Sequence, residues 1–304
     1  MLKEKGKTET LVLNMGPQHP STHGVLRVVL ELDGEVIVKA TPHIGYLHRG
    51  LEKLSEHLTY HQVITLTDRM DYLGPMINNL GYVLTVEKML DIKVPLRTQY
   101  IRVLLSELTR IQSHLVWMGT HAHDIGAMTP VLYAFREREQ ILDLFEMVCG
   151  ARMNPSYFRV GGLAYDLPDG FISKVEEFLR IMPSRVDEYE ALLTKNKIWM
   201  IRTKGVGVIT SDEAINLGLS GPSLRACGVN WDIRKAEPYS GYENFNFEIA
   251  TGENGDVYDR YLVRIKEMRE SLKIIDQAVK YLPDGPINVN APKVVLPPKD
   301  KVYN

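Results

Sequence analysis

A long helical repeat downstream of Pro95 constrains the fold more than any other feature of this 304-residue chain. Proline suits the first turn of a helix, because it lacks the amide hydrogen that this position leaves unbonded. Apolar residues then recur with a period of about 3.6 and predict a helix that ends near residue 120. Its predicted apolar face comprises Ile101, Leu104, Leu105, Leu108, Ile111, Leu115 and Met118.

Three shorter helical patterns accompany this helix, at residues 48–66, 75–90 and 131–149. Helices joined by short connections pack as a bundle, in which each helix buries its apolar face. We therefore expect residues 46–150 to form a four-helix bundle that serves as the core of the fold.

The first 45 residues are instead predicted to be a β region. An Asp33-Gly34 pair between two apolar runs is a strong signal for a tight hairpin. Upstream of the hairpin, two prolines and two glycines crowd a loop that presents His19 and His23, because such a segment fits neither a helix nor a sheet. The predicted strands are residues 11–13, 25–32 and 35–40.

Residues 151–304 are predicted to form a smaller mixed α/β region, which makes the whole chain α+β. Thr210 and Glu213 have the spacing of a capping box and predict a short helix. Pro183 is expected to interrupt a helical stretch. The remaining predicted elements are a strand at 157–160, helices at 169–182 and 184–195, and a final amphipathic helix at 257–281.

Composition excludes several classes of protein. The formal net charge is -2 and no run of like charge reaches five, so we expect no nucleic-acid partner. No apolar stretch approaches the roughly 18 residues that a membrane span needs, and the N-terminus lacks a secretory signal. The two cysteines, Cys149 and Cys227, are too few to hold an iron-sulfur cluster or a cysteine-rich zinc site.

The nine histidines all fall within the first 123 residues. His57 and His61 have helical i,i+4 spacing, but Leu58 stands where a metalloprotease motif needs glutamate, which disfavours zinc. His114 lies on the apolar face of the long helix and is expected to be a hydrogen-bonded core histidine. Motifs of nucleophile elbows, phosphate-binding loops and dinucleotide-binding folds are absent from the sequence.

Six segments in order along nearly the whole chain resemble one family, the quinone-site core subunit of respiratory complex I, the proton-pumping NADH:quinone oxidoreductase. That family is itself similar to the large subunit of nickel-iron hydrogenases, without the metal, so the resemblance implies a hydrogenase-like helical bundle. The segments are MGPQHPSTHGVLR (15–27), PHIGYLHRGLEKL (42–54), DRMDYL (68–73), DIGAMTPVLYAFREREQILDLFE (124–146), GVNWDIRK (228–235) and PYSGYENF (238–245).

The resemblance implies a catalytic role for three residues. His23 and Tyr72 match the residues that hydrogen-bond the quinone headgroup, and Asp124 matches a carboxylate that pairs with the histidine. The chemistry is consistent, because reduction makes both quinone carbonyl oxygens basic, and Tyr and His supply a donor at each edge. Without the resemblance, Tyr72 would be interpreted as a tyrosine that packs in the core, and Asp124 as a residue that caps the end of its helix.

The resemblance places three further residues near the terminal iron-sulfur cluster of a partner subunit. Arg49 and Arg69 match arginines beside that cluster, and cations there stabilise its reduced state. Asn154 stands where many relatives have a histidine. The alternative for Arg49 is a surface ion pair with Glu52 or Glu56.

The resemblance also implies cofactors, partners and location. Quinone is the expected substrate, and no metal or covalent cofactor is expected in this chain. The expected partners are other complex I subunits, especially the iron-sulfur subunit that carries the terminal cluster, and the membrane-arm subunits. The chain is expected to lie peripherally on the cytoplasmic face of the cell membrane or the equivalent matrix side.

Three other functions stay open at this stage. A hydrogenase-type large subunit needs two CxxC pairs, and neither exists here. A ferredoxin-fed relative of complex I would keep His23, Tyr72 and Asp124, whereas an assembly scaffold would not need them. The family extends roughly another hundred residues beyond the position of Asn304, so its C-terminal part is expected either to be missing from this sequence or to be absent from the protein.

Overall fold

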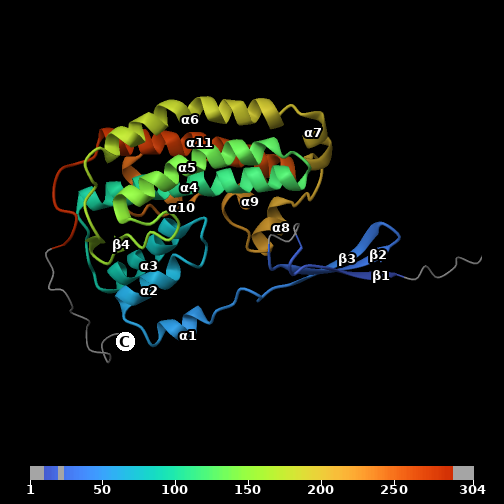
Figure 1. Cartoon of the computed structure of the whole chain (residues 1–304), viewed down its shortest axis with the longest axis horizontal. Helices are drawn as coiled ribbons and strands as arrows, with labels where there is room; N and C mark the ends of the chain where they lie inside the picture. Colours follow the sequence, from blue (N-terminus) through green and yellow to red (C-terminus); the bar gives the residue numbers. More distant parts are fainter. Residues whose placement is uncertain (1–9, 20–23, 290–304) are drawn as a thin grey trace, which may run out of the picture. The chain divides into compact units, whose positions relative to one another are not determined.

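The computed structural model describes residues 10–19 and 24–289 (Figure 1). The chain divides into two compact units, residues 1–57 and residues 58–304. Helices and small antiparallel sheets occur in the same chain, so the predicted α+β class is confirmed.

The first unit is built on a three-stranded antiparallel sheet in the order β1-β2-β3. β1 (Leu11–Met15) pairs with β2 (Arg27–Asp33), which pairs with β3 (Val36–His43). The predicted tight hairpin is confirmed, and Gly34 supplies its left-handed backbone conformation with φ of 61°. A short helix, α1 (Leu51–Ser55), follows the sheet.

The second unit is mainly helical, with a two-stranded ribbon of β4 (Phe158–Arg159) and β5 (Gly162–Leu163). Within the described ranges, no helix combines the length and apolarity needed to cross a membrane. The helices are α2 (Tyr60–Thr67), α3 (Pro75–Met89), α4 (Leu96–Asp124), α5 (Thr129–Cys149), α6 (Phe171–Leu193), α7 (Lys197–Thr203), α8 (Ser211–Asn216), α9 (Gly221–Ala226), α10 (Ile233–Ala236), the 3-10 helix η2 (Tyr242–Asn244) and α11 (Val257–Lys280).

Four long helices, α4, α5, α6 and α11, pack side by side as a bundle (Figure 1). The prediction that residues 48–66 and 75–90 supply two of the four members is wrong. Residues 48–66 do not form one helix, because Thr59 and Gln62 make a capping box that starts α2 separately from α1. α3 packs against α2 and α4, beside the bundle.

The predicted long helix is confirmed as α4, which continues to Asp124. All seven residues of its predicted apolar face are buried. Burying one such side chain stabilises the fold by about 1.5–3 kcal/mol. α4 therefore anchors the second unit by packing against both α5 and α11.

The predicted interruption at Pro183 is wrong, because α6 runs unbroken through it. Proline removes one amide donor from the helix interior. The Ser184 hydroxyl donates to the Ile181 carbonyl at 2.8 Å, which adds a side-chain hydrogen bond to the helix next to the proline. Packing of α6 against α5 and α11 then outweighs the local preference of proline.

A chain of buried charges links α4 and α11 of the bundle to α9 and α10. The carboxylate of Glu107 accepts hydrogen bonds from Arg234 Nη1 (3.0 Å), Tyr242 Oη (2.6 Å) and Ser271 Oγ (2.6 Å). Burial alone would raise the pKa of Glu107, but Arg110 and Arg234 hold it well below its usual range.

Glu267 on α11 is a second buried centre. It accepts a hydrogen bond from Arg225 Nε at 2.9 Å, and His114 Nε2 lies 2.7 Å from its other oxygen. Despite burial, His114 and Arg225 lower the pKa of Glu267 to about 2. The prediction that His114 is a hydrogen-bonded core histidine is confirmed. We call these groups the core ion network: Glu107, Arg110, His114, Arg225, Asp232, Arg234 and Glu267.

Candidate functional site

Two of the predicted site residues lie on the turn that joins α2 to α3. α2 ends at Thr67, and Asp68 caps it. The turn closes through hydrogen bonds from Gly74 N to the Asp71 carbonyl (3.1 Å) and from Leu73 N to Asp71 Oδ1 (2.9 Å). These bonds hold Tyr72 on the surface with 56% of its area exposed. Tyr72 is therefore not a core packing residue.

Arg69 is fixed at the start of the same turn. Its Nη1 donates to the Thr65 carbonyl at 2.6 Å and to Asp68 Oδ1 at 2.8 Å. The arginine side chain is 43% exposed, whereas that of Asp68 is completely buried. One end of the guanidinium is thus held by α2 while the rest reaches the surface.

Asn154 lies on the loop between α5 and β4. Its Oδ1 is buried and has no hydrogen-bond partner within the described residues. The β4–β5 ribbon that follows this loop is held by a buried ion pair, in which Arg102 Nη2 lies 2.7 Å from Glu87 Oε1. Arg102 also donates to the carbonyls of Arg159 in β4 (2.8 Å) and Gly162 in β5 (3.1 Å), so the ribbon is tied to α3 and α4.

Asp124 is the last residue of α4 and is exposed. The C-terminus of a long helix carries a partial negative charge, which favours a cation there and opposes a carboxylate. A cationic partner next to Asp124 would therefore be stabilised twice, by the carboxylate and by the helix end.

The other two predicted site residues belong to the first unit. His23 lies outside the described residues. Arg49 is exposed and directly precedes the N-cap of α1. Of the two glutamates considered as its partners, Glu56 is bound by Lys53 through Nζ and Oε2 at 2.5 Å.

A buried cation near the turn was not expected from the sequence. Arg138 on α5 is buried, and its guanidinium carbon lies 5.3 Å from the centre of the Phe135 ring. Burial lowers the pKa of Arg138, an effect that the charges of Glu139 and Tyr72 partly offset. An arginine on the inward face of an amphipathic helix was the sequence signal that could have identified it.

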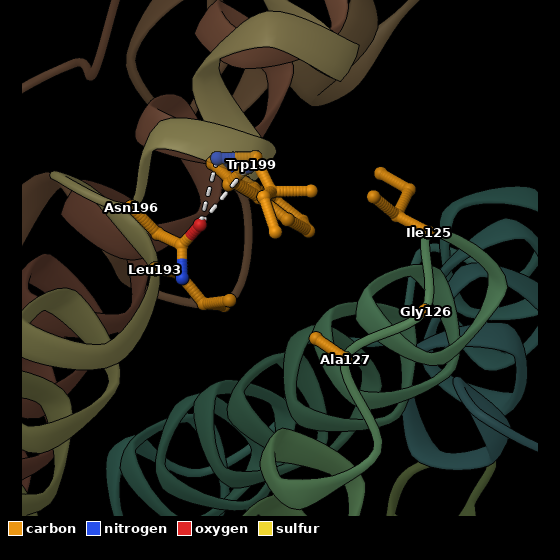
Figure 2. A pocket seen from close by; sticks show the side chains of 7 residues that line it. Ile125, Gly126, Ala127, Leu193, Asn196 and Trp199 are labelled. Carbon is orange, nitrogen blue, oxygen red and sulfur yellow. Dashed lines mark hydrogen bonds between the residues drawn. The ribbon is translucent and has the colours of Figure 1, made fainter.

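A cavity of about 180 Å³ lies between the α4–α5 turn and α7. Figure 2 shows Ile125 and Ala127 on one side of it, with Leu193, Asn196 and Trp199 on the other. The side-chain oxygen of Asn196 already accepts hydrogen bonds from the backbone amides of Ile198 and Trp199. None of the predicted site residues that the structure describes lines this cavity, and it is smaller than the roughly 300 Å³ of typical ligand pockets.

The sequence disfavours His57 and His61 as zinc ligands. His57 follows α1 in the first unit, and His61 lies in the first turn of α2 in the second. Burial lowers the pKa of His61, and the charge of Arg159 adds to the effect. Among the described residues, no group of three histidine, cysteine, aspartate or glutamate side chains is arranged to hold a metal ion.

Residues 124–304 match the family described as the respiratory-chain NADH dehydrogenase 49-kDa subunit. The chain is 65% identical over 297 residues to a subunit of the NADH-quinone oxidoreductase of Citrifermentans bemidjiense, covering 98% of this chain and 76% of that protein. The protein of the same name from Geotalea uraniireducens is 62% identical over the same shares. A subunit of the NADH-quinone oxidoreductase of Chloroflexus aurantiacus is 63% identical over 98% of this chain and 73% of its own length.

Proposed function

Because the chain belongs to the family of the 49-kDa subunit of respiratory-chain NADH dehydrogenase, we propose that it forms the quinone headgroup site of an NADH:quinone oxidoreductase. It acts as a core subunit of complex I, a multisubunit, ion-translocating enzyme of the respiratory chain. The names of the relatives favour this function over a hydrogenase-type large subunit, a ferredoxin-fed complex or a scaffold.

Tyr72 donates a hydrogen bond to one quinone carbonyl oxygen, and His23 donates to the other. Two-electron reduction adds two protons to a quinone, one on each oxygen, so a donor at each edge is needed. The exposed position of Tyr72 on a closed turn carries this proposal, because a headgroup can reach its hydroxyl without disturbing the core. Arg138 adds a buried positive charge near the site where negative charge develops.

Asp124 orients the imidazole of His23 and stabilises its protonated form. The position of this carboxylate at the negative end of α4 supports the pairing, because both features attract a cation. The pair then holds a proton close to the headgroup until reduction makes the carbonyl oxygen basic.

Arg49, Arg69 and Asn154 face the terminal iron-sulfur cluster of a partner subunit, which supplies the electrons. Positive charge beside a cluster favours its reduced form. Asn154 presents an amide that gains no proton in the physiological range, unlike the histidine of many relatives.

The rest of the assembly is proposed on the same basis. The chain binds the iron-sulfur subunit and the membrane-arm subunits, and it lies peripherally on the cytoplasmic face of the membrane or the equivalent matrix side. Its bundle is of the hydrogenase large-subunit type. Its functional parts are residues 1–45 with the His23 loop, residues 46–150 and residues 151–304.

A structure of the assembled complex with a quinone or a site inhibitor bound tests this function. We expect the Tyr72 hydroxyl within about 3 Å of one headgroup oxygen, the distance of an ordinary hydrogen bond. The second oxygen should lie at similar range from His23. A headgroup bound away from both residues would refute the proposal.

A further inference from the structure

Asp68 is a fully buried carboxylate that the proposed quinone chemistry does not use. Its side chain has no exposed area. Oδ1 accepts a hydrogen bond from Arg69 Nη1 at 2.8 Å, whereas Oδ2 is buried and has no partner in the described part of the chain. A buried charge is unfavourable unless it is paired. Asp68 therefore depends on Arg69 for compensation.

The groups around Asp68 do not replace that compensation. Burial raises the pKa of Asp68, and Arg69 and then Ser156 on the α5–β4 loop only partly offset this rise. The Ser156 hydroxyl makes no hydrogen bond of ordinary geometry, and its φ of 44° is unusual for a residue other than glycine. The Arg159 guanidinium donates to the carbonyls of Ser156 and Phe158. Cys149 also faces this region, where burial raises the pKa of its thiol and the charge of Asp68 adds to the rise.

The ion pair with Asp68 fixes one end of the Arg69 guanidinium. Both hydrogen bonds of the arginine use Nη1, one to Asp68 and one to the Thr65 carbonyl. Among the described residues, Nη2 and Nε of Arg69 make no hydrogen bond to the protein. A guanidinium is a rigid planar group, so holding Nη1 at two points sets the direction of the remaining donors.

We propose that Asp68 is a positioning residue for Arg69, whose buried carboxylate aims the free end of the guanidinium at the partner subunit's cluster. This inference rests on the proposed function, in which Arg69 lies beside that cluster. Asp68 acts only through Arg69, because it is buried and has no surface to offer the partner or the quinone.

The test is a double-mutant cycle in the assembled complex with Asp68→Asn, Arg69→Gln and both changes together. The midpoint potential and spectrum of the terminal cluster are measured by electron paramagnetic resonance. Asp68→Asn should shift both in the same direction as Arg69→Gln, and the double variant should match Arg69→Gln alone, because a residue that acts through another adds nothing after its loss. Shifts that add in the double variant would overturn the proposal.

A second variant separates position from charge. Asp68→Glu keeps the negative charge but moves it by one methylene, so it should also shift the cluster signal. It serves as the test if Asp68→Asn fails to assemble, and an unchanged signal would overturn the proposal. Asp187→Asn is the matched control, because Asp187 pairs with Arg269 at 2.7 Å on an exposed surface; it should leave the signal unchanged.

The two proposals fail differently in this experiment. An unchanged signal in Arg69→Gln would remove Arg69 from the cluster environment and overturn both. A shifted signal in Arg69→Gln with no shift in either Asp68 variant would leave the proposed function intact and overturn the role of Asp68 alone.

Discussion

Two groups of buried polar residues in the second unit differ in their hydrogen bonding. One group finds its hydrogen-bond partners within the chain, and the other leaves some atoms without one. In the core ion network, the Glu107 carboxylate accepts hydrogen bonds from Arg110, Arg234, Tyr242 and Ser271 of the same chain. Around the α2–α3 turn, the atoms Asp68 Oδ2, Asn154 Oδ1 and Ser156 Oγ are buried without a partner in the described ranges. The carboxylate of the first group is therefore fully hydrogen-bonded within the chain, whereas the second group contains buried atoms that are not.

We expect the first group to hold the fold and the second to serve the proposed site. A buried polar atom without a partner costs free energy. The core ion network uses residues from α4, α9, α10 and α11 and binds these helices together. We expect substitutions in the network to reduce stability, and substitutions at the turn to reduce activity.

Glu107→Ala should have the largest effect on stability. Removing this buried carboxylate leaves Arg110 without its carboxylate partner and leaves Arg234 with Asp232 alone, so it should cost about 3–5 kcal/mol in the free energy of unfolding. Urea unfolding of the purified full chain measures this. Glu176→Ala, on the exposed side of α6, is the control and should change stability by no more than about 0.5 kcal/mol. Equal changes in the free energy of unfolding for the two substitutions would contradict a stabilising role of the core ion network.

Tyr72→Leu should nearly abolish quinone reduction while leaving the unfolding transition in place. Tyr72→Phe keeps the ring that supports the headgroup and loses only the donor, so activity should fall roughly tenfold, the equivalent of about 1.4 kcal/mol. Quinone reductase activity of the assembled complex is the measurement. Electron transfer from NADH to a water-soluble artificial acceptor should survive in both variants. Unchanged quinone reduction in Tyr72→Leu would remove Tyr72 from the site.

His23→Ala and Asp124→Asn should each lower quinone reduction by roughly tenfold or more. The loss should be larger at high pH than at low pH, because a stored proton matters most where free protons are scarce. Initial rates measured across a pH series show this. A loss of the same size at every pH would mean that the two residues only orient the headgroup.

Acid should destabilise the protein by protonating carboxylates of the core ion network. The folded-state pKa of Glu267 is about 2, below its ordinary 4.5, so the unfolded chain binds more protons as the pH falls. This contribution is complete above about pH 4.5 and disappears as the pH falls towards 2, which corresponds to about 3 kcal/mol. Unfolding at several pH values should show this slope, and Glu267→Gln should make it shallower, while Glu107 and Asp232, whose pKa values are also lowered, maintain part of it. An equally steep slope in the variant would assign it to other carboxylates.

Asn154→His should have the smallest effect. Asparagine does not titrate between about pH 5 and 9, so the potential of the partner's terminal cluster should depend little on pH in the unmodified protein. The substitution should introduce that dependence without blocking turnover. Redox titration by electron paramagnetic resonance is the measurement. A slope of about 59 mV per pH unit in the unmodified protein would mean that another group carries the coupling.

Local signals predicted most of the secondary structure. The Asp33-Gly34 pair, the Thr210 capping box and the apolar period of α4 each depend on neighbouring residues, and each is observed. The two errors have different causes. Pro183 remains inside α6 because packing against distant segments outweighs its local preference. The predicted helix at residues 48–66 fails because a local capping box at Thr59 starts α2 separately, and α6 and α11 complete the bundle instead.

The sequence by itself determined the family, the elements and the residue types available for quinone chemistry, because motifs and periodicity are properties of neighbouring positions. Only the tertiary structure decided which buried polar groups have hydrogen-bond partners within the chain. Glu107 meets Arg234 across 127 positions and Glu267 meets His114 across 153, and no local pattern predicts such pairs. The burial of Asp68 beneath Arg69 likewise follows from packing against the α5–β4 loop, since burial is set by neighbours in space rather than in sequence.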